Sequence, residues 1–290
     1  MPNPVIGFIG YGAMARPMGT NLQKAGYEVF AYTPSGRISG AQALPTPRSV
    51  AEKADVIIFC VPNDAAENNA LHGPDGALAG LDATKLVIDT STVSPDQADT
   101  FAALAADHGF SLIDAPMSGS TPEAEKGELI MLVGGSDQAV QRAKPILDIV
   151  GKLTIHAGPA GNAARLKLVV NGIMGATLNV IAEGVSYGLS AGLDRQVVFE
   201  TLQHLAVISP HHKRKLKMAE EKNFPSQFPT RLMSKDMGLL IDAGRKAGAF
   251  MPAMAVADQA LALSNNRHSD EDYSALIGAM ERSVANIAHK

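Results

Sequence analysis

A glycine turn between an apolar strand and a helix is the feature that most constrains the fold of this chain. Residues 5–9 are predicted to form a buried strand, and the turn Gly10-Tyr11-Gly12-Ala13-Met14-Ala15 follows directly. Gly10 permits a tight turn, Gly12 lets backbone N–H groups approach a pyrophosphate, and Ala15 allows close packing of helix on strand. Between a strand and a helix, this motif predicts dinucleotide binding; the alternative is a tight turn that holds no ligand.

The rest of the first half repeats the alternation of strand and helix. Further strands are predicted at residues 28–32, 56–61, 86–89, 111–114, 129–133 and 152–156, and helices at 13–25, 95–108 and 137–150. Apolar strands that alternate with amphipathic helices predict a mostly parallel sheet covered on both faces.

After Gly161 the strand signals stop. Residues 162–193 are predicted to form one long helix, apolar on all sides and therefore buried inside protein. Further helices are predicted at 195–205, 211–222, 232–247, 252–263 and 270–288. We therefore expect an α/β Rossmann-type N-terminal domain, residues 1–161, followed by an all-α C-terminal domain, residues 162–290, joined by the long helix.

Composition excludes several classes of function. With a net charge of −4 over 290 residues, the chain has no general attraction for nucleic acid. Its one charge run, HHKRKLKMAEEK at residues 211–222, turns from basic to acidic and is interpreted as a solvated helix face. The eight histidines and single cysteine show no metal-ligand spacing, so no metal site is expected.

Membrane association is not expected either. The longest apolar region, residues 166–193, contains Asn171, Asn179 and Glu183, which are costly at a bilayer centre. The N-terminus lacks the basic start of a signal peptide. These features favour a cytoplasmic protein.

The segment after the second strand bears on the choice between NAD and NADP. NAD sites usually place an acidic residue here to bind the ribose 2′-hydroxyl. This chain instead offers Thr33, Ser35 and Arg37, a set that suits a 2′-phosphate. The pattern favours NADP over NAD, unless the segment is only a polar surface loop.

Lys167 and Asn171 are four residues apart in the long helix and so share one face. A lysine in a mostly apolar helix needs a partner, a substrate or a long reach to water. Spacing alone leaves two interpretations open, a catalytic pair and a structural ion pair between domains.

Four motifs together make the chain resemble the β-hydroxyacid dehydrogenase family. That family includes 3-hydroxyisobutyrate dehydrogenase, tartronate semialdehyde reductase and succinic semialdehyde reductases. The motifs are GFIGYGAMARPMGTNL at residues 7–22, DAPMSGS at 114–120, KLVVN at 167–171 and LMSKDMGL at 232–239. The resemblance covers nearly the whole chain and implies an NAD(P)-dependent dehydrogenase that interconverts a small 3-hydroxy acid and its semialdehyde.

The resemblance also implies roles for individual residues. Lys167 matches the catalytic lysine, while Ser118, Gly119 and Asn171 match positions that bind substrate. The positions implied to contact cofactor are Gly10, Gly12, Ala13, Met14, Val61, Pro62, Thr92 and Lys235, beside Thr33, Ser35 and Arg37 from the segment above. Family members are oligomeric, so a homodimer or homotetramer is expected, with a small carboxylate as substrate.

Two departures from the family pattern are visible, and three alternatives remain open. Ala15 replaces a third glycine, and residues 120–123, STPE, replace a more glycine-rich stretch, which leaves the shape of the substrate pocket undetermined. A 6-phosphogluconate dehydrogenase would be longer, with histidine in place of Val170, and imine reductases usually lack lysine at position 167. The third alternative is a non-catalytic dinucleotide-binding protein, which would have no need of a proton donor.

Overall fold

The computed structural model describes residues 3–288 and the side chains as far as residue 283. By its internal contacts the chain divides into two compact units, Met1–Lys167 and Leu168–Lys290. The long helix α7, Asn162–Ser190, begins in the first unit and continues into the second. The predicted domain boundary at residue 162 coincides with the start of this helix and stays a prediction.

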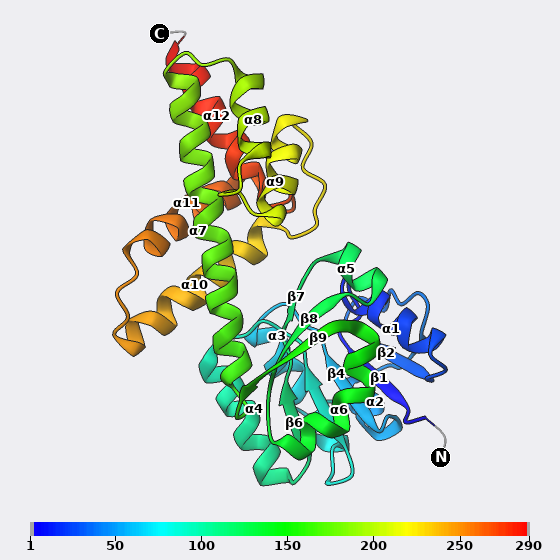
Figure 1. Ribbon diagram of the computed structural model, residues 1–290. Coiled ribbons are helices and arrows are strands. Elements are labelled where there is room, and N and C mark those ends of the chain that lie inside the picture. The colour runs from blue at the N-terminus through cyan, green and yellow to red at the C-terminus, as the bar shows by residue number, and fades with distance from the viewer. Residues whose placement is uncertain (1–2, 289–290) are drawn as a thin grey trace. The chain divides into compact units, whose positions relative to one another are not determined.

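The first unit is built on one sheet of nine strands (Figure 1). Its order is β3-β2-β1-β4-β5-β6-β8-β7, and β9 pairs with β8. All pairs are parallel except those that β8 makes with β6 and β7, so the predicted mostly parallel sheet is confirmed. The strands are β1 Ile6–Ile9, β2 Val29–Tyr32, β3 Gln42–Ala43, β4 Val56–Phe59, β5 Leu86–Asp89, β6 Ser111–Asp114, β7 Met117–Ser118, β8 Leu129–Gly134 and β9 Gly151–Gly158.

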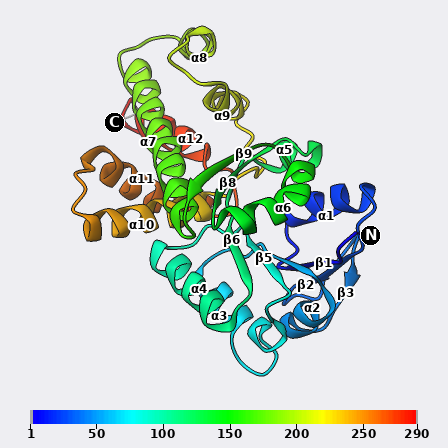
Figure 2. The ribbon, with the colours of Figure 1, turned by 60° about the horizontal axis from the view of Figure 1, so that its bottom comes forward.

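Helices cover both faces of this sheet (Figure 2). They are α1 Ala15–Lys24, α2 Pro47–Lys53, α3 Asp64–Leu71, η1 Ala77–Gly80, α4 Pro95–His108, α5 Thr121–Lys126 and α6 Asp137–Val150. Alternate residues of β4 enter two different cores: Val56 and Ile58 pack with α1 and α6, whereas Ile57 and Phe59 pack with α2, α3 and α4. This period of two explains why the strands are continuous apolar runs.

The second unit is helical, as predicted. After α7 it contains α8 Arg195–His204, α9 Pro210–Glu220, α10 Thr230–Ala247, α11 Pro252–His268 and α12 Ala275–Ala288. The prediction of a helix over residues 270–288 was wrong at its start. Asp272 is fully buried, and its carboxylate accepts hydrogen bonds from the backbone N–H groups of Gln227, Phe228 and Ser274. That role requires an irregular backbone before α12.

Helix α7 is long and apolar enough to cross a membrane by length and composition, but half of the residues in its apolar window are buried inside the protein. One such helix is weak evidence for a membrane span, because core helices of globular proteins pass the same test. The prediction that α7 is buried on all sides was wrong for one face. Val169, Ile173, Val180 and Tyr187 lie within about 40° of one another around the helix and are 48–75% exposed.

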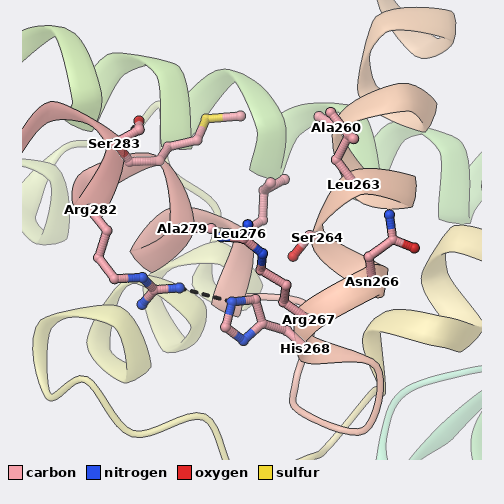
Figure 3. A pocket seen from close by; sticks show the side chains of 11 residues that line it. Ala260, Leu263, Ser264, Asn266, Arg267, His268, Leu276, Ala279, Arg282 and Ser283 are labelled. Atoms are coloured by element: carbon pink, nitrogen blue, oxygen red, sulfur yellow. Dashed lines mark hydrogen bonds between the residues drawn. The ribbon is translucent and has the colours of Figure 1, made fainter. Parts of the chain in front are cut away.

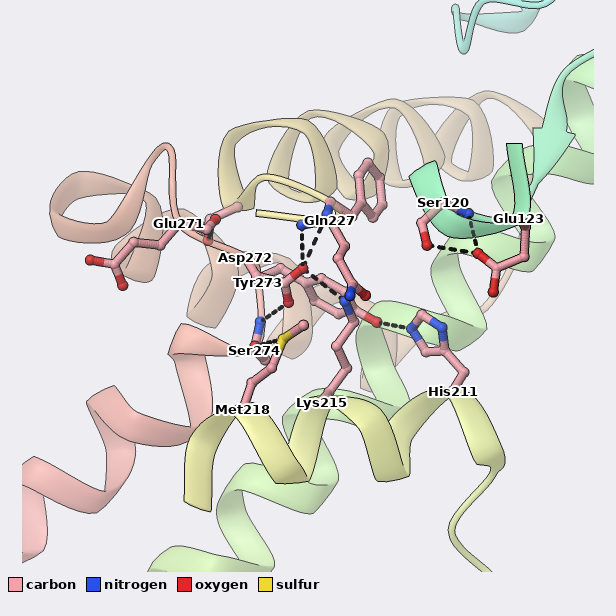
Figure 4. A network of polar contacts seen from close by, with 12 residues as sticks. Ser120, Glu123, His211, Lys215, Met218, Gln227, Glu271, Asp272, Tyr273 and Ser274 are labelled. Carbon is pink, nitrogen blue, oxygen red and sulfur yellow. Dashed lines mark hydrogen bonds and ion pairs between the residues drawn. The ribbon is translucent and has the colours of Figure 1, made fainter. Parts of the chain in front are cut away.

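The predicted solvated face of the charge run was also partly wrong. Lys215, on α9, is 1% exposed, and its Nζ lies 2.7 Å from Oδ2 of Asp272 (Figure 4). Beside this pair, Nε2 of His211 lies 2.6 Å from the hydroxyl of Tyr273. Burial and the neighbouring Lys215 lower the pKa of His211 to about 3. The basic residues of this helix therefore include one that anchors the core.

Candidate functional site

The carboxyl ends of β1 and β4 mark the point where the strand order reverses, because β2 lies on one side of β1 and β4 on the other. In open α/β sheets, ligands bind outside the carboxyl ends of the strands at such a point. The backbone joins the loops there: Gly10 N–H donates to Tyr32 O and Cys60 N–H donates to Ile9 O, both at 2.9 Å. The glycine turn, the Thr33 segment and the Val61 loop therefore share one edge.

The two glycines of the turn have different roles in the structure. Gly10 has a φ of +90°, and a Cβ there would lie 2.3 Å from the carbonyl oxygen of Cys60, so only glycine fits. A Cβ at Gly12 would meet no protein atom within 4 Å. The space at Gly12 is therefore open for close approach by a ligand to the backbone.

The start of α1 differs from the starts of four other helices around the sheet. Helices α2, α3, α4 and α6 each have a backbone N–H bound by the side chain of a capping residue, namely Thr46, Asn63, Ser94 and Ser136. At α1 the capping residue is Met14, with no side-chain hydrogen bond and no acidic residue in the first turn. Its N–H groups and positive dipole end suit an anion such as a pyrophosphate.

The segment after β2 forms a turn in which Gly36 N–H donates to Thr33 O at 2.9 Å. Arg37 N–H donates to the hydroxyl of Ser35 at 3.4 Å, and the side chains of Ser35 and Arg37 are exposed. The structure thus places this polar set next to the glycine turn, with a cation at its outer end.

The loops after β4 and β5 are joined by a side chain. Val61 N–H donates to the hydroxyl of Ser91 at 3.1 Å, which fixes the Val61-Pro62 loop beside Thr92. Cys60, immediately before that loop, has its thiol pKa raised to about 11, mainly by burial. It is therefore a protonated, unreactive side chain at neutral pH.

Asp114 attaches the first turn of α7 to the same edge. Its carboxylate accepts hydrogen bonds from Gly161 N–H and Ala164 N–H, both at 2.9 Å. Lys167 follows one turn later on α7 and is 8% exposed. Asp114 ends β6, and β7 follows at once and ends at Ser118. The helix that carries the predicted lysine is therefore anchored at the strand that leads into the predicted carboxylate-binding loop.

One backbone N–H group of the loop after β7 is already bound within the protein. Ser120 N–H and its hydroxyl both donate to Oε2 of Glu123 at 2.8 Å, so this N–H group is already used. Gly119 has a φ of +136°, and a Cβ there would lie 2.8 Å from the side chain of Leu129. The Ser118 side chain and the Gly119 backbone are therefore the candidate contacts of this loop.

In the second unit, Asp236 brings two predicted residues together. Nδ2 of Asn171 donates to Oδ2 of Asp236 at 2.6 Å, and Nζ of Lys235 lies 3.0 Å from Oδ1 of Asp236. Asn171 is fully buried, and its Oδ1 has no hydrogen-bond partner among the residues that the structure describes. Asp236 orients the Asn171 amide so that this oxygen is available to another group.

Sequence analysis missed Asp236, although a signal for it exists. The buried face of α10 contains Met233, Met237, Leu240 and Ile241, and Asp236 lies within that same helical stripe. A carboxylate on an otherwise apolar face is a sign of a buried polar partner.

A cavity of about 550 Å³ lies between α11 and α12, lined by Arg267, His268 and Arg282 among others (Figure 3). Nη2 of Arg282 lies 2.8 Å from Nε2 of His268. None of the predicted site residues lines this cavity. Among residues 3–283, no group of three or more histidine, cysteine, aspartate or glutamate side chains is placed to hold a metal ion.

Two family models match consecutive parts of the chain. Residues 5–158 match the NAD-binding domain of 6-phosphogluconate dehydrogenase. Residues 161–280 match the model described as NAD-binding of NADP-dependent 3-hydroxyisobutyrate dehydrogenase. The two matches meet at the start of α7.

Similar proteins match along nearly the whole chain. It is 33% identical to 2-(hydroxymethyl)glutarate dehydrogenase of Eubacterium barkeri, with 96% of this chain and 95% of that protein covered. It is 32% identical to glyoxylate/succinic semialdehyde reductase 2 of Arabidopsis thaliana, with 98% and 81% covered. Among solved structures, 3-hydroxyisobutyrate dehydrogenase of Mycobacterium tuberculosis with L-serine gives a TM-score of 0.84 at 30% identity, with 96% and 99% covered.

Proposed function

This chain belongs to the β-hydroxyacid dehydrogenase family of NAD(P)-dependent oxidoreductases, and on that premise we propose that it interconverts a small 3-hydroxy acid and its semialdehyde. One observation carries the proposal most directly. Lys167 and Asn171, buried and one turn apart on α7, lie in a chain whose relatives match from end to end. The proposed substrate is a small alcohol or aldehyde that also bears a carboxylate.

Lys167 is proposed as the proton donor and acceptor. Nicotinamide, when bound, supplies a hydride to the aldehyde carbon or removes one from the alcohol. In reduction, negative charge develops on the carbonyl oxygen, and the ammonium of Lys167 stabilises that charge and donates a proton to it. In oxidation the neutral amine accepts the hydroxyl proton. Aldehyde, hydride and proton together balance to give the alcohol.

Asn171 is proposed to accept a hydrogen bond from the reacting hydroxyl or from Lys167. Its Oδ1 is buried without a partner among the described residues, and Asp236 holds its Nδ2 at 2.6 Å. An unsatisfied buried carbonyl oxygen costs about 1–3 kcal/mol, which a donor from the substrate or the lysine would recover.

Ser118 and Gly119 are proposed to bind the substrate carboxylate. The positive φ of Gly119 gives the loop a turn that other residues adopt at a cost, and Ser118 offers its side-chain hydroxyl. Donors fixed by the backbone hold the carboxylate so that the reacting carbon is positioned for hydride transfer.

The cofactor is proposed to bind at the carboxyl edge of the sheet. There the uncapped start of α1 and the open space at Gly12 fit a pyrophosphate. The proposed contacts are Gly10, Gly12, Ala13, Met14, Val61, Pro62, Thr92 and Lys235. We favour NADP over NAD, since Thr33, Ser35 and Arg37 offer two hydroxyls and a cation to a 2′-phosphate and no carboxylate repels it.

A cytoplasmic homodimer or homotetramer is the assembly proposed. The apolar face of α7 supports association of two copies, because Val169, Ile173, Val180 and Tyr187 follow one side of the helix over about 27 Å and are exposed in a single chain. Covering that stripe with the same stripe of a second copy would give a symmetric contact.

A panel of substrates tests the proposal. The change in nicotinamide absorbance is followed with 3-hydroxyisobutyrate, 2-(hydroxymethyl)glutarate, L-serine, glyoxylate and succinic semialdehyde, each with NADP(H) and NAD(H). Turnover of at least one hydroxy acid or semialdehyde is expected. Cofactor binding without turnover of any of them would instead favour a non-catalytic dinucleotide-binding protein.

A further inference from the structure

A buried pair of carboxyl groups lies beneath the cofactor-binding edge. Glu67, on α3, is fully buried, and Asp89, at the end of β5, is 2% exposed. The two side chains are within hydrogen-bond contact of each other. Two carboxylates cannot bond each other, since each is only an acceptor, so one of them must carry a proton.

The contacts of Glu67 leave one of its two carboxyl oxygens without a donor. Its Oε1 accepts a hydrogen bond from Nε2 of Gln97 at 2.9 Å, whereas its Oε2 has no donor among the described residues. Asp89 already accepts from Ser91 N–H at 3.0 Å. A proton on Oε2 of Glu67 would supply the missing bond by donating to Asp89, whose ionised form the Ser91 group favours.

The electrostatic surroundings agree with a single proton. Burial and the charge of Asp89 raise the pKa of Glu67 to about 10, while burial raises the pKa of Asp89 to about 6 against the hydrogen bonds from Ser91. The other charged groups that act on the pair are Asp64 on α3 and Asp114 at the end of β6, both acidic. Cys60, directly after β4, also lies in the electrostatic field of Asp89, and its thiol stays protonated.

This pair is connected to the cofactor-binding loops. Asp89 holds Ser91, and the hydroxyl of Ser91 accepts the hydrogen bond from Val61 N–H at 3.1 Å. We propose that Glu67 is a positioning residue that keeps one buried proton, donates a hydrogen bond through it to Asp89 and, by way of Ser91, fixes Val61 at the edge where the cofactor is proposed to bind. The inference rests on the proposed cofactor site, and extends it to a residue that touches neither cofactor nor substrate.

The first experiment measures the proton without cofactor. Wild type, Glu67→Gln and the exposed control Glu125→Gln are unfolded with urea at pH 6.5–8.5. Glu67 is ionised when unfolded and protonated when folded in this range, so wild-type stability falls as pH rises, by up to about tenfold in the unfolding equilibrium per pH unit from this group. Glu67→Gln should lack that slope, and Glu125→Gln should follow wild type. Parallel slopes for wild type and Glu67→Gln would overturn the proposal.

The second experiment measures positioning through NADPH affinity at pH 7. Glu67→Ala should weaken NADPH affinity about tenfold, or about 1.4 kcal/mol. Without the donor from Glu67, Asp89 no longer holds Ser91, and through it Val61, in place. Glu67→Gln should rescue binding to within about twofold of wild type, since its amide can accept from Gln97 and donate to Asp89. Equal loss in both variants would overturn the positioning role. Wild type that binds neither NADPH nor NADH would refute the cofactor site and this role together, whereas the urea slope would still report the proton.

Discussion

The two units of the molecule bury carboxylates with different partners. In the first unit, Asp89 and Asp114 are held by backbone N–H groups, those of Ser91 and of the first turn of α7. In the helical unit, Asp272 also accepts hydrogen bonds from backbone N–H groups, but it and Asp236 each lie beside a lysine as well, and the Lys215–Asp272 pair is 0–1% exposed.

This difference predicts which property of each unit a substitution changes first. A backbone N–H group cannot be removed by substitution, so changes near the proposed cofactor site that leave the backbone conformation intact should alter binding more than folding. Removal of one lysine from a buried ion pair leaves an uncompensated charge, which is strongly destabilising. Changes to these ion pairs in the helical unit should therefore lower the free energy of unfolding.

The largest expected effect is on the buried ion pair. Lys215→Met should lower the free energy of unfolding by about 3–5 kcal/mol, because Asp272 is left charged and buried. The matched control is Lys217→Met on the same helix, whose exposed ion pair with Glu221 is worth at most about 1 kcal/mol. Urea denaturation of both variants measures the difference. Equal, small losses would contradict the contrast between the units.

The second effect is on catalysis. Lys167→Ala should reduce kcat by about 100-fold or more, since a charged donor to the developing oxyanion is lost. NADPH affinity, measured by fluorescence, should remain within about twofold of wild type, because the proposed role of Lys167 is towards substrate oxygen. Wild-type turnover in this variant would make Lys167 a structural residue.

The third effect separates the two glycines of the turn. Gly12→Ala should fold normally, since its Cβ meets no protein atom within 4 Å, yet weaken NADPH by tens of fold, about 2 kcal/mol. Gly10→Ala should also lose stability, because its Cβ would lie 2.3 Å from Cys60 O. Thermal melts and binding titrations on both variants check this. A destabilised Gly12→Ala protein, or one with unchanged affinity, would remove Gly12 from the cofactor site.

The smallest effect concerns cofactor choice. Arg37→Ala should weaken NADPH by about tenfold and leave NADH nearly unchanged, because a charge-assisted bond to the 2′-phosphate is worth roughly 1.5–3 kcal/mol and exposure reduces it. Comparing kcat/KM for both cofactors in wild type and variant measures this. A wild-type preference for NADH would overturn the assignment of Thr33, Ser35 and Arg37.

The sequence predicted those features of the fold whose signals are local. The alternation of strands and helices and the all-α second half are confirmed, because periodicity and the glycine turn are local signals. The two-residue strands β3 and β7 are too short to show a period. Asp236 and Glu67 were missed because their partners, Asn171 and Asp89, lie far away along the chain. The assignments of individual site residues stay predictions.

Asp114 has a consequence for anyone who wishes to recombine this chain with a relative. Its carboxylate accepts hydrogen bonds from the N–H groups of Gly161 and Ala164, so the first turn of α7 is held in place by strand β6, which Asp114 ends. A chimera joined at residue 162 would take the sheet from one parent and the bound turn from the other, with Lys167 just beyond it. Joining the parents after Lys167 keeps that turn, its anchor and the lysine from a single ancestor.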